Sequence, residues 1–297
     1  MSNAAAAAPI AERRRIDPLP LLRSAATSLL LLGAFWALWE GYKWLGERIG
    51  IDWPFTVNER TMPHIHEMFG QLFEPSRRNG PLLIDVLADA ALFTAREAAV
   101  GFALGGTIGF AIAVVLSESR LLQRGFLPYI VASQTIPILA IAPMVVIWIN
   151  PKLPDPLAGW GAVAVIAAYL TFFPVAINTL RGLTSVDPRA VELMRSYASS
   201  RWSILWKLRA PASLPYFFTA LKIAAPAAVV GAIIGELPSS IQDGLAGAIL
   251  NFNQYYVTSP PSLWATNIVA AAVGILFFAV VAIAERLVVR RAPENVA

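Results

Sequence analysis

Long runs of apolar residues dominate the chain and alternate with short polar and charged stretches. Six runs are about 20 residues long, enough for an α-helix to cross a ~30 Å hydrocarbon core. None shows the strict apolar–polar alternation of membrane β-barrel strands. The pattern therefore predicts an all-α polytopic membrane protein with about six transmembrane helices. The predicted spans are 21–39, 91–116, 126–149, 159–180, 216–235 and 263–284.

These spans divide the chain into a short first part and a larger core. The five later spans form the predicted core, which includes a charged loop between the fourth and fifth. The predicted parts are an N-terminal tail (1–20), a first span (21–40), an outer loop (41–90), a five-span core (91–285) with its loop (181–215), and a C-terminal tail (286–297).

Composition supports the membrane class and removes several kinds of site. Hydrophobic residues make up 57% of the chain and charged residues 14%, against about 45–50% and 25% in soluble domains. The chain contains no cysteine, which excludes disulfides, thiolate catalysis and cysteine-bound metals. A phosphate-binding G-x4-GK[ST] loop is also absent from the sequence, so ATP hydrolysis would need another chain.

The distribution of Lys and Arg predicts the orientation. Fifteen of the 23 basic residues fall in the N-terminal tail together with Arg23, the loops 117–125 and 181–215, and the C-terminal tail, whereas six fall in the loops of the other face. Basic residues accumulate on the cytoplasmic side of a membrane protein. We therefore expect a multi-pass protein with both termini in the cytoplasm. This asymmetry accounts for the net charge of +4 without a nucleic-acid partner.

The third predicted span carries three prolines and a central amide. Pro128, Pro137 and Pro143 would kink the helix, and Gln134 lies near its middle. Kinks in lipid are tolerated where neighbouring helices or a water-filled cavity satisfy the freed backbone groups. Two interpretations remain open: a kinked bundle helix with a satisfied amide, or a helix lining the translocation path, with Gln134 and Pro137 facing the solute.

The fifth predicted span contains Lys222 and ends at Glu236. Lys222 is about two turns from the cytoplasmic end, so its amine can snorkel to the interface. Glu236 is expected at the opposite mouth, followed by a Gly- and Ser-rich stretch suited to a re-entrant or gating loop. Both residues are candidates for the translocation path.

The second predicted span has glycines at every fourth position. Gly101, Gly105 and Gly109 would form one face of the helix, and small residues at this spacing let two membrane helices approach closely. The face could pack inside the bundle or form a subunit interface. Arg96 and Glu97 are expected near the outer end of this span, where snorkelling keeps their cost low.

The outer loop contains the two histidines of the chain, His64 and His66. A helical metal site would need a spacing of three or four and further ligands. We therefore interpret them as surface histidines and expect no metal site.

The charged loop (181–215) is predicted to form two short helices joined by a sharp turn, which we call the elbow. Asp187 followed by Pro188 is a helix start, with a capping carboxylate and proline at the first helical position. Ser199 or Ser200 can begin a second short helix, in which Trp202, Leu205 and Trp206 share one face. We expect that helix to lie flat in the headgroup region and to end at Pro211.

The spacing in this loop resembles a known signature. Permeases of bacterial ABC importers carry EAA-x3-G-x9-I-x-L-P here, and from Glu192 this chain reads "ELMRSYASSRWSILWKLRAP", with Pro211 in register. Leu193 and Met194 replace the alanines, and Ala210 replaces the leucine. Ala198 replaces the glycine and keeps a small side chain at the point where two short helices must turn sharply. The downstream "PASLPYFFTALKIA" and the region of about 85–285 resemble the subfamily that imports nitrate, sulfonates, taurine and thiamine precursors.

The resemblance implies a permease subunit of the bacterial inner membrane that couples to a separate cytoplasmic ATPase. It implies two such ATPases, which hold the ATP and Mg²⁺, a second permease copy or paralogue, and a periplasmic solute-binding protein. The solute would be a small organic or anionic nutrient, such as a sulfonate, nitrate or a thiamine-pyrimidine-like precursor, and this chain would bind no cofactor. The implied ATPase-coupling residues are Glu192, Leu193, Met194, Arg195, Ser196, Tyr197, Ala198 and Ser199.

Two other classes of function remain as alternatives, a secondary transporter and a channel subunit. A secondary transporter more often has ionisable residues at mid-span and paired broken helices. A channel more often has rings of charged residues. The sequence favours neither, because its spans contain few ionisable residues.

Overall fold

The computed structural model describes residues 18–50, 56–77, 79–155 and 157–289. They form helices in two compact units, residues 1–66 and 67–297, which we describe separately. The first unit consists of α1 (Pro18–Ile49) and the chain that follows it as far as His66. A short helix, α2 (Ile65–Gly70), begins at the end of this unit.

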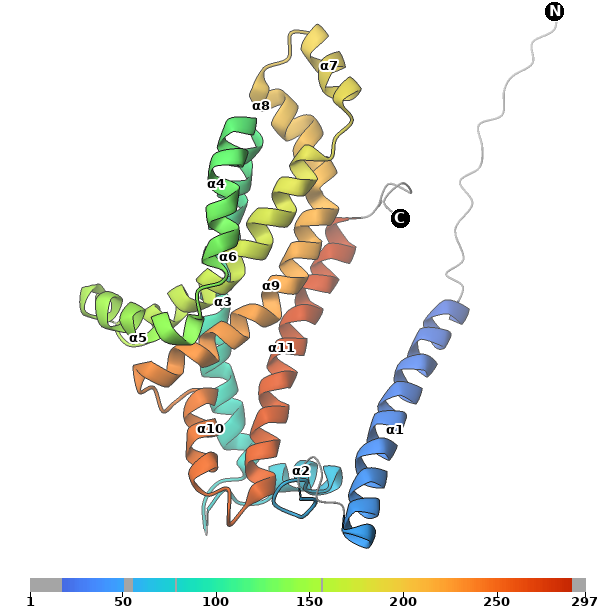
Figure 1. The fold of residues 1–297 in the computed structure, drawn as a ribbon, viewed down its shortest axis with the longest axis vertical. Helices are drawn as coiled ribbons and strands as arrows, with labels where there is room; N and C mark the ends of the chain where they lie inside the picture. The colour runs from blue at the N-terminus through green and yellow to red at the C-terminus, as the bar shows by residue number, and fades with distance from the viewer. Residues whose placement is uncertain (1–17, 51–55, 78, 156, 290–297) are drawn as a thin grey trace, which may run out of the picture. The chain divides into compact units, whose positions relative to one another are not determined.

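Four long helices form the bundle of the second unit (Figure 1). They are α3 (Leu83–Ser117), α6 (Gly161–Thr184), α9 (Ala210–Ser239) and α11 (Pro260–Val288). Helix α6 packs against both α3 and α9, and α11 packs along α9. The shorter elements are α4 (Arg120–Ser133), α5 (Ile138–Ile149), α7 (Pro188–Ser196), α8 (Arg201–Ile204), α10 (Leu245–Gln254), two 3₁₀ turns (Gln71–Phe73, Asn150–Lys152) and a π-helical turn (Leu205–Arg209).

The four bundle helices confirm four of the predicted spans. Among the described residues, these four are the unbroken helices that are long and apolar enough to cross a membrane. Helix α9 is continuous with the helix that begins at Arg201. They cover the second, fourth, fifth and sixth predicted spans. The first predicted span coincides with α1, which is not among these four, so its crossing of the membrane stays a prediction.

The third predicted span is not one kinked helix, and that expectation was wrong. It divides into α4 and α5, which meet at 97° and together form either a broken span or a re-entrant loop. Pro137 lies at the break, just before α5, with φ −67° and ψ 112°. A proline has no N–H and disfavours helical backbone in the residue before it. Pro128 and Pro143, in contrast, lie inside α4 and α5.

The glycines of α3 provide the close contact on which the bundle is built. Gly101, Gly105 and Gly109 are buried against α6. A Cβ atom added at Gly109 would lie 2.6 Å from the Phe172 carbonyl oxygen and 2.9 Å from the Val175 Cβ. Because α6 covers this face, the glycines serve packing inside the bundle, and a subunit interface on the same face is excluded.

The glycine contact leads to a first prediction. Gly109→Ala should lower stability by about 1–3 kcal/mol, because the added methyl group must push α6 away. Gly106→Ala is the matched control, since a Cβ there would meet its nearest neighbour, Leu221 Cδ2, at 3.8 Å. Thermal unfolding of the two variants in detergent measures the difference. Equal stability of the two would contradict the assigned contact.

Candidate functional site

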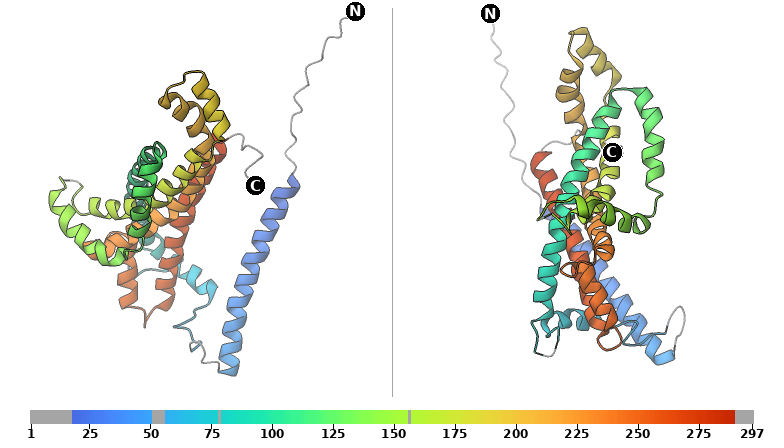
Figure 2. Two further views of the ribbon diagram at one scale, coloured as in Figure 1. Left: turned by 45° about the horizontal axis from the view of Figure 1, so that its top comes forward. Right: turned by 90° about the vertical axis from the view of Figure 1, so that its left-hand side faces the viewer.

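The elbow and α10 lie at opposite ends of the second unit (Figures 1 and 2). The elbow begins as predicted. Asp187 caps α7, with its Oδ1 atom accepting a hydrogen bond of 2.8 Å from the Arg189 backbone N–H. Pro188 occupies the first turn, where its missing N–H costs nothing.

A left-handed residue makes the turn of the elbow. Ala198 has φ +54°, and its N–H donates to the Arg195 carbonyl oxygen at 2.9 Å. The Ser199 N–H donates to the Met194 carbonyl oxygen at 3.1 Å. These two bonds form a Schellman motif, in which glycine is the usual residue at the left-handed position. The predicted sharp turn at Ala198 is confirmed, and this backbone explains why the resembled signature has glycine there.

The predicted coupling residues lie on the surface of the elbow. Leu193 is 59% exposed and Tyr197 78% exposed, and they are four residues apart, so they are neighbours on one side. Such large apolar side chains are usually covered when they cluster. Of the remaining members, two are half-buried (Met194, Ser199) and four are exposed (Glu192, Arg195, Ser196, Ala198). The group is therefore accessible to a partner.

The second arm of the elbow differs from the predicted separate helix. Ser200 caps it, with Oγ accepting from the Ser203 N–H at 3.2 Å, but Pro211 does not end it. A π-helical turn, in which the Ala210 N–H donates to the Leu205 carbonyl oxygen, leads directly into α9. The wider turn accommodates the proline ring. The expectation of a separate helix that ends at Pro211 was therefore wrong.

The predicted shared face of Trp202, Leu205 and Trp206 is also divided between the interior and the surface. Leu205 is buried against the ends of α3 and α6, whereas Trp202 and Trp206 are exposed. Arg209 reaches across, with Nη1 donating to the Ser117 carbonyl oxygen at 3.3 Å and lying 3.9 Å from Glu118. The base of the elbow is thus attached to the end of α3.

The amide predicted for the translocation path lies in the break between α4 and α5. Gln134 follows the last residue of α4, and both it and Pro137 are exposed. The break is anchored to the bundle because the Tyr169 hydroxyl of α6 donates to the Ser133 carbonyl oxygen at 2.6 Å. Contact of Gln134 or Pro137 with a solute stays a prediction.

Lys222 has a partner that the sequence did not indicate. Its Nζ atom is 2.6 Å from Glu285 Oε2, and each side chain is about one-quarter exposed. The pair joins α9 to α11. Snorkelling alone therefore does not explain how the Lys222 charge is tolerated, because the Glu285 carboxylate on α11 neutralises it.

Glu236 lies near the end of α9 opposite the elbow, as predicted, but it is an interior residue. Its role on the translocation path stays a prediction. Glu236 is 1% exposed and accepts hydrogen bonds from the Thr94 hydroxyl at 2.5 Å and the Ala246 N–H at 2.8 Å. The Thr94 hydroxyl in turn accepts from the Leu245 N–H at 2.8 Å. Two bundle helices together satisfy the first amides of α10, which would otherwise lack partners.

The hydrogen bonds that Thr94 and Glu236 accept from α10 form a cap on that helix. Glu97 lies one turn after Thr94 on α3 and is also fully buried. Its predicted snorkelling position is wrong, whereas Arg96 does turn outward, with its guanidinium 4.5 Å from the centre of the Trp160 ring. Neither oxygen of Glu97 has a hydrogen-bond partner among the described residues.

The cap holds α10 as one wall of a cleft. The cleft has a volume of about 970 Å³ and lies between the start of α3, the 71–81 segment and α10. Charged and aromatic side chains both line it, including Arg77, Asp89, Asp243, Phe93 and Tyr255. Its size is in the range of small-molecule sites. The stretch after Glu236, which was expected to form a re-entrant or gating loop, thus contains a short, anchored helix.

Comparison with known proteins gives the family. Residues 105–292 match the model of the binding-protein-dependent transport system inner membrane component family. The chain belongs to this family. Together with four apolar helices of spanning length, this membership makes it a multi-pass membrane protein.

Individual relatives carry different solute names. The chain is 33% identical over 184 residues to a formylaminopyrimidine transport permease protein of Halalkalibacterium halodurans, covering 61% of this chain and 69% of the relative. It is 29% identical to a riboflavin transport system permease protein of Chloroflexus aurantiacus, over 58% and 60% of the two chains. It is 25% identical to a nitrate import permease protein of Synechocystis, over 74% and 75%. The riboflavin match spans less than two-thirds of that relative.

The cap of α10 can be tested at Thr94. Thr94→Val replaces the hydroxyl with a methyl group and leaves the Leu245 N–H and one Glu236 oxygen without partners, at about 1–3 kcal/mol for each group. We expect lower thermal stability and faster hydrogen exchange in the first turn of α10. Thr94→Ser should preserve both. Thr107→Val is a second control, because the Thr107 hydroxyl bonds to the Ala103 carbonyl oxygen of its own helix. Unchanged exchange in Thr94→Val would contradict the assignment.

The Lys222–Glu285 pair can be tested by a double-mutant cycle. Lys222→Met and Glu285→Gln should each lower stability by about 1–3 kcal/mol, because each leaves one charge without its partner in a largely apolar setting. The double variant should recover much of that loss. Thermal unfolding in detergent measures all four proteins. Additive losses would show that the two charges are independent.

Proposed function

We propose that this chain is the transmembrane permease subunit of a binding-protein-dependent ABC importer. It would form the solute pathway and couple that pathway to ATP hydrolysis on a separate cytoplasmic subunit. The observation that carries the proposal is the elbow. It presents Leu193 and Tyr197 at one end of a bundle whose sequence belongs to an importer family.

The coupling surface would be residues 192–199. Its apolar side chains supply the part of an interface that is buried on binding, and Glu192 and Arg195 supply a charged rim. A groove on the ATPase would receive α7. The working unit would contain two ATPase subunits with their ATP and Mg²⁺, and a second permease, either a copy of this chain or a paralogue.

The attachment of the elbow favours a mechanical role. The second arm runs into α9 as one helical segment, Arg201–Ser239, and Arg209 links its base to α3. Movement of a bound ATPase would therefore act on two bundle helices together. Gln134, in the exposed break between α4 and α5, is the residue that we propose to contact the solute.

The solute would be a small organic or anionic nutrient. The relatives are named for formylaminopyrimidine, riboflavin and nitrate transport, and these compounds share small size and polar groups. A periplasmic binding protein would deliver the solute to the face that bears the cleft. This arrangement follows the orientation predicted by the basic residues, with both termini in the cytoplasm.

The experiment is a matched pair of substitutions at Ala198. Asp and Asn both accept the left-handed backbone and are nearly equal in size, so they differ mainly in charge. Ala198→Asp should lose solute uptake and co-purify with at least about 100-fold less ATPase, because an unpaired charge at a packed interface costs about 3 kcal/mol or more. Ala198→Asn should retain far more of both. The measurements are uptake by intact cells and mass-spectrometric quantification of P-loop ATPases bound to the tagged full-length chain.

The same pair separates the alternatives. Ala198 is exposed, so the aspartate should leave folding intact, and equal thermal stability of the two variants checks this. Uptake and ATPase binding that survive Ala198→Asp would refute the coupling surface. Uptake that instead collapses when the proton or sodium gradient is dissipated, with ATP maintained, would indicate a secondary transporter.

A further inference from the structure

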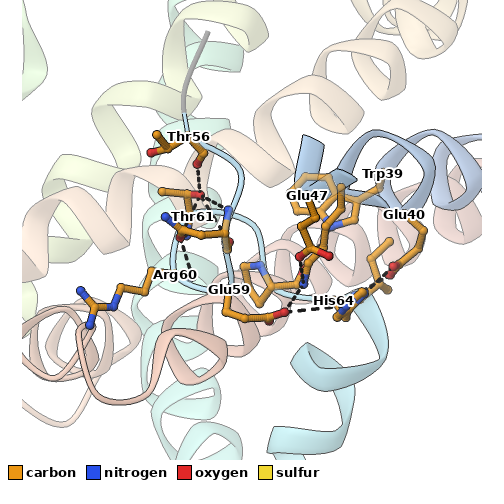
Figure 3. A network of polar contacts seen from close by, with 12 residues as sticks. Trp39, Glu40, Glu47, Thr56, Glu59, Arg60, Thr61 and His64 are labelled. Carbon is orange, nitrogen blue, oxygen red and sulfur yellow. Dashed lines mark hydrogen bonds and ion pairs between the residues drawn. The ribbon is translucent and has the colours of Figure 1, made fainter. Parts of the chain in front are cut away.

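The end of α1 carries a polar network that the proposed transport function does not use (Figure 3). The chain at 56–66 folds back onto the last turns of α1. Trp39 Nε1 donates to the Pro63 carbonyl oxygen at 3.1 Å. The fully buried Lys43 places its Nζ atom 2.9 Å from Glu59 Oε1. These contacts hold the returning segment in one register against the helix.

The returning segment is itself rigid. Asn58 Oδ1 accepts hydrogen bonds of 2.9 Å from the N–H groups of both Arg60 and Thr61. The Thr61 hydroxyl donates to the Thr56 carbonyl oxygen at 2.5 Å. Figure 3 shows this turn beside the Glu59 and His64 side chains. The turn therefore positions the histidines that follow it.

Three metal-ligating side chains meet at this point. His64 Nδ1 is 2.6 Å from Glu40 Oε2, and the rings of His64 and His66 have centres 5.2 Å apart. One ligand atom from each of Glu40, His64 and His66 lies within 4.8 Å of the others. Around a tetrahedral Zn²⁺ with bonds of about 2.1 Å, ligand atoms are about 3.4 Å apart. Small rotations of the side chains would reach that spacing.

The carboxylate is oriented for this role. The second oxygen of Glu40, Oε1, accepts a hydrogen bond of 3.0 Å from the Ile65 N–H. Such contacts fix the direction of a metal ligand and strengthen binding. The sequence alone gave two histidines at a spacing unsuited to a helical pair, and the fold supplies the missing third ligand from α1. His64 is only about one-third exposed, so the prediction of a simple surface histidine does not hold for it.

We propose that Glu40, His64 and His66 bind one Zn²⁺ ion at the end of α1. Two imidazoles and one carboxylate suit zinc and related transition metals, whereas Mg²⁺ and Ca²⁺ prefer all-oxygen sites. The ion would link Glu40 of α1 to His64 and His66, which follow it by 24 and 26 residues. Water would complete the coordination, because His66 is exposed. The ion would thus fasten the returning segment to the helix.

The test is zinc binding by the full-length protein in detergent, purified with a histidine-free tag and stripped of metal. The chain has two histidines and no cysteine, so the background from other strong ligands is low. Calorimetric titration should show one Zn²⁺ per chain and a higher unfolding temperature with zinc. Excess Mg²⁺ should not compete.

Ligand variants and a matched control decide the assignment. Glu40→Gln, His64→Ala and His66→Ala should each weaken zinc binding about tenfold or more. Glu47→Gln should leave it unchanged, because Glu47 lies on the same helix and approaches Lys43 at 3.9 Å. His66→Ala is the most informative variant, since this exposed side chain can be removed without disturbing the fold. Absence of saturable binding, or undiminished affinity in any ligand variant, would overturn the proposal.

Discussion

The close approach of α3 to α6 is the contact on which the rest of the bundle depends. Exclusion of water does not press two helices together inside hydrocarbon, so backbone contact through small residues must supply the attraction. Gly101, Gly105 and Gly109 allow that contact. Helix α6 also packs against α9, and α9 carries the elbow at one end and Glu236 near the other.

The continuity of α9 connects the two ends of the second unit. Its helix runs from Arg201 to Ser239, about 58 Å at 1.5 Å per residue. At one end it continues the arm of the elbow, and at the other Glu236 holds the first turn of α10. A shift of the elbow would therefore reach the wall of the cleft through one continuous helix, a route that fits the coupling we propose.

Strong local signals explain what could be predicted from the residues. Asp187–Pro188 begins α7 because a carboxylate and a proline suit the first turn of any helix, and the long apolar runs define the bundle helices for the same kind of reason. Two local expectations still failed. Pro211 does not end a helix, because a π turn just before it lets the helix continue. Pro137 lies at a full break between two helices instead of at a kink. A proline restricts the backbone but does not by itself choose between these outcomes.

The sequence by itself determined the membrane class, the bundle helices, the turn at Ala198 and the family resemblance, because each depends on neighbours a few residues apart. Only the tertiary structure decided which polar groups meet. Thr94 and Glu236 are 142 residues apart, Lys222 pairs with a carboxylate on another helix, and Glu40 meets His64 across 24 residues. No local pattern encodes such pairs, since they follow from how whole helices and returning segments are placed.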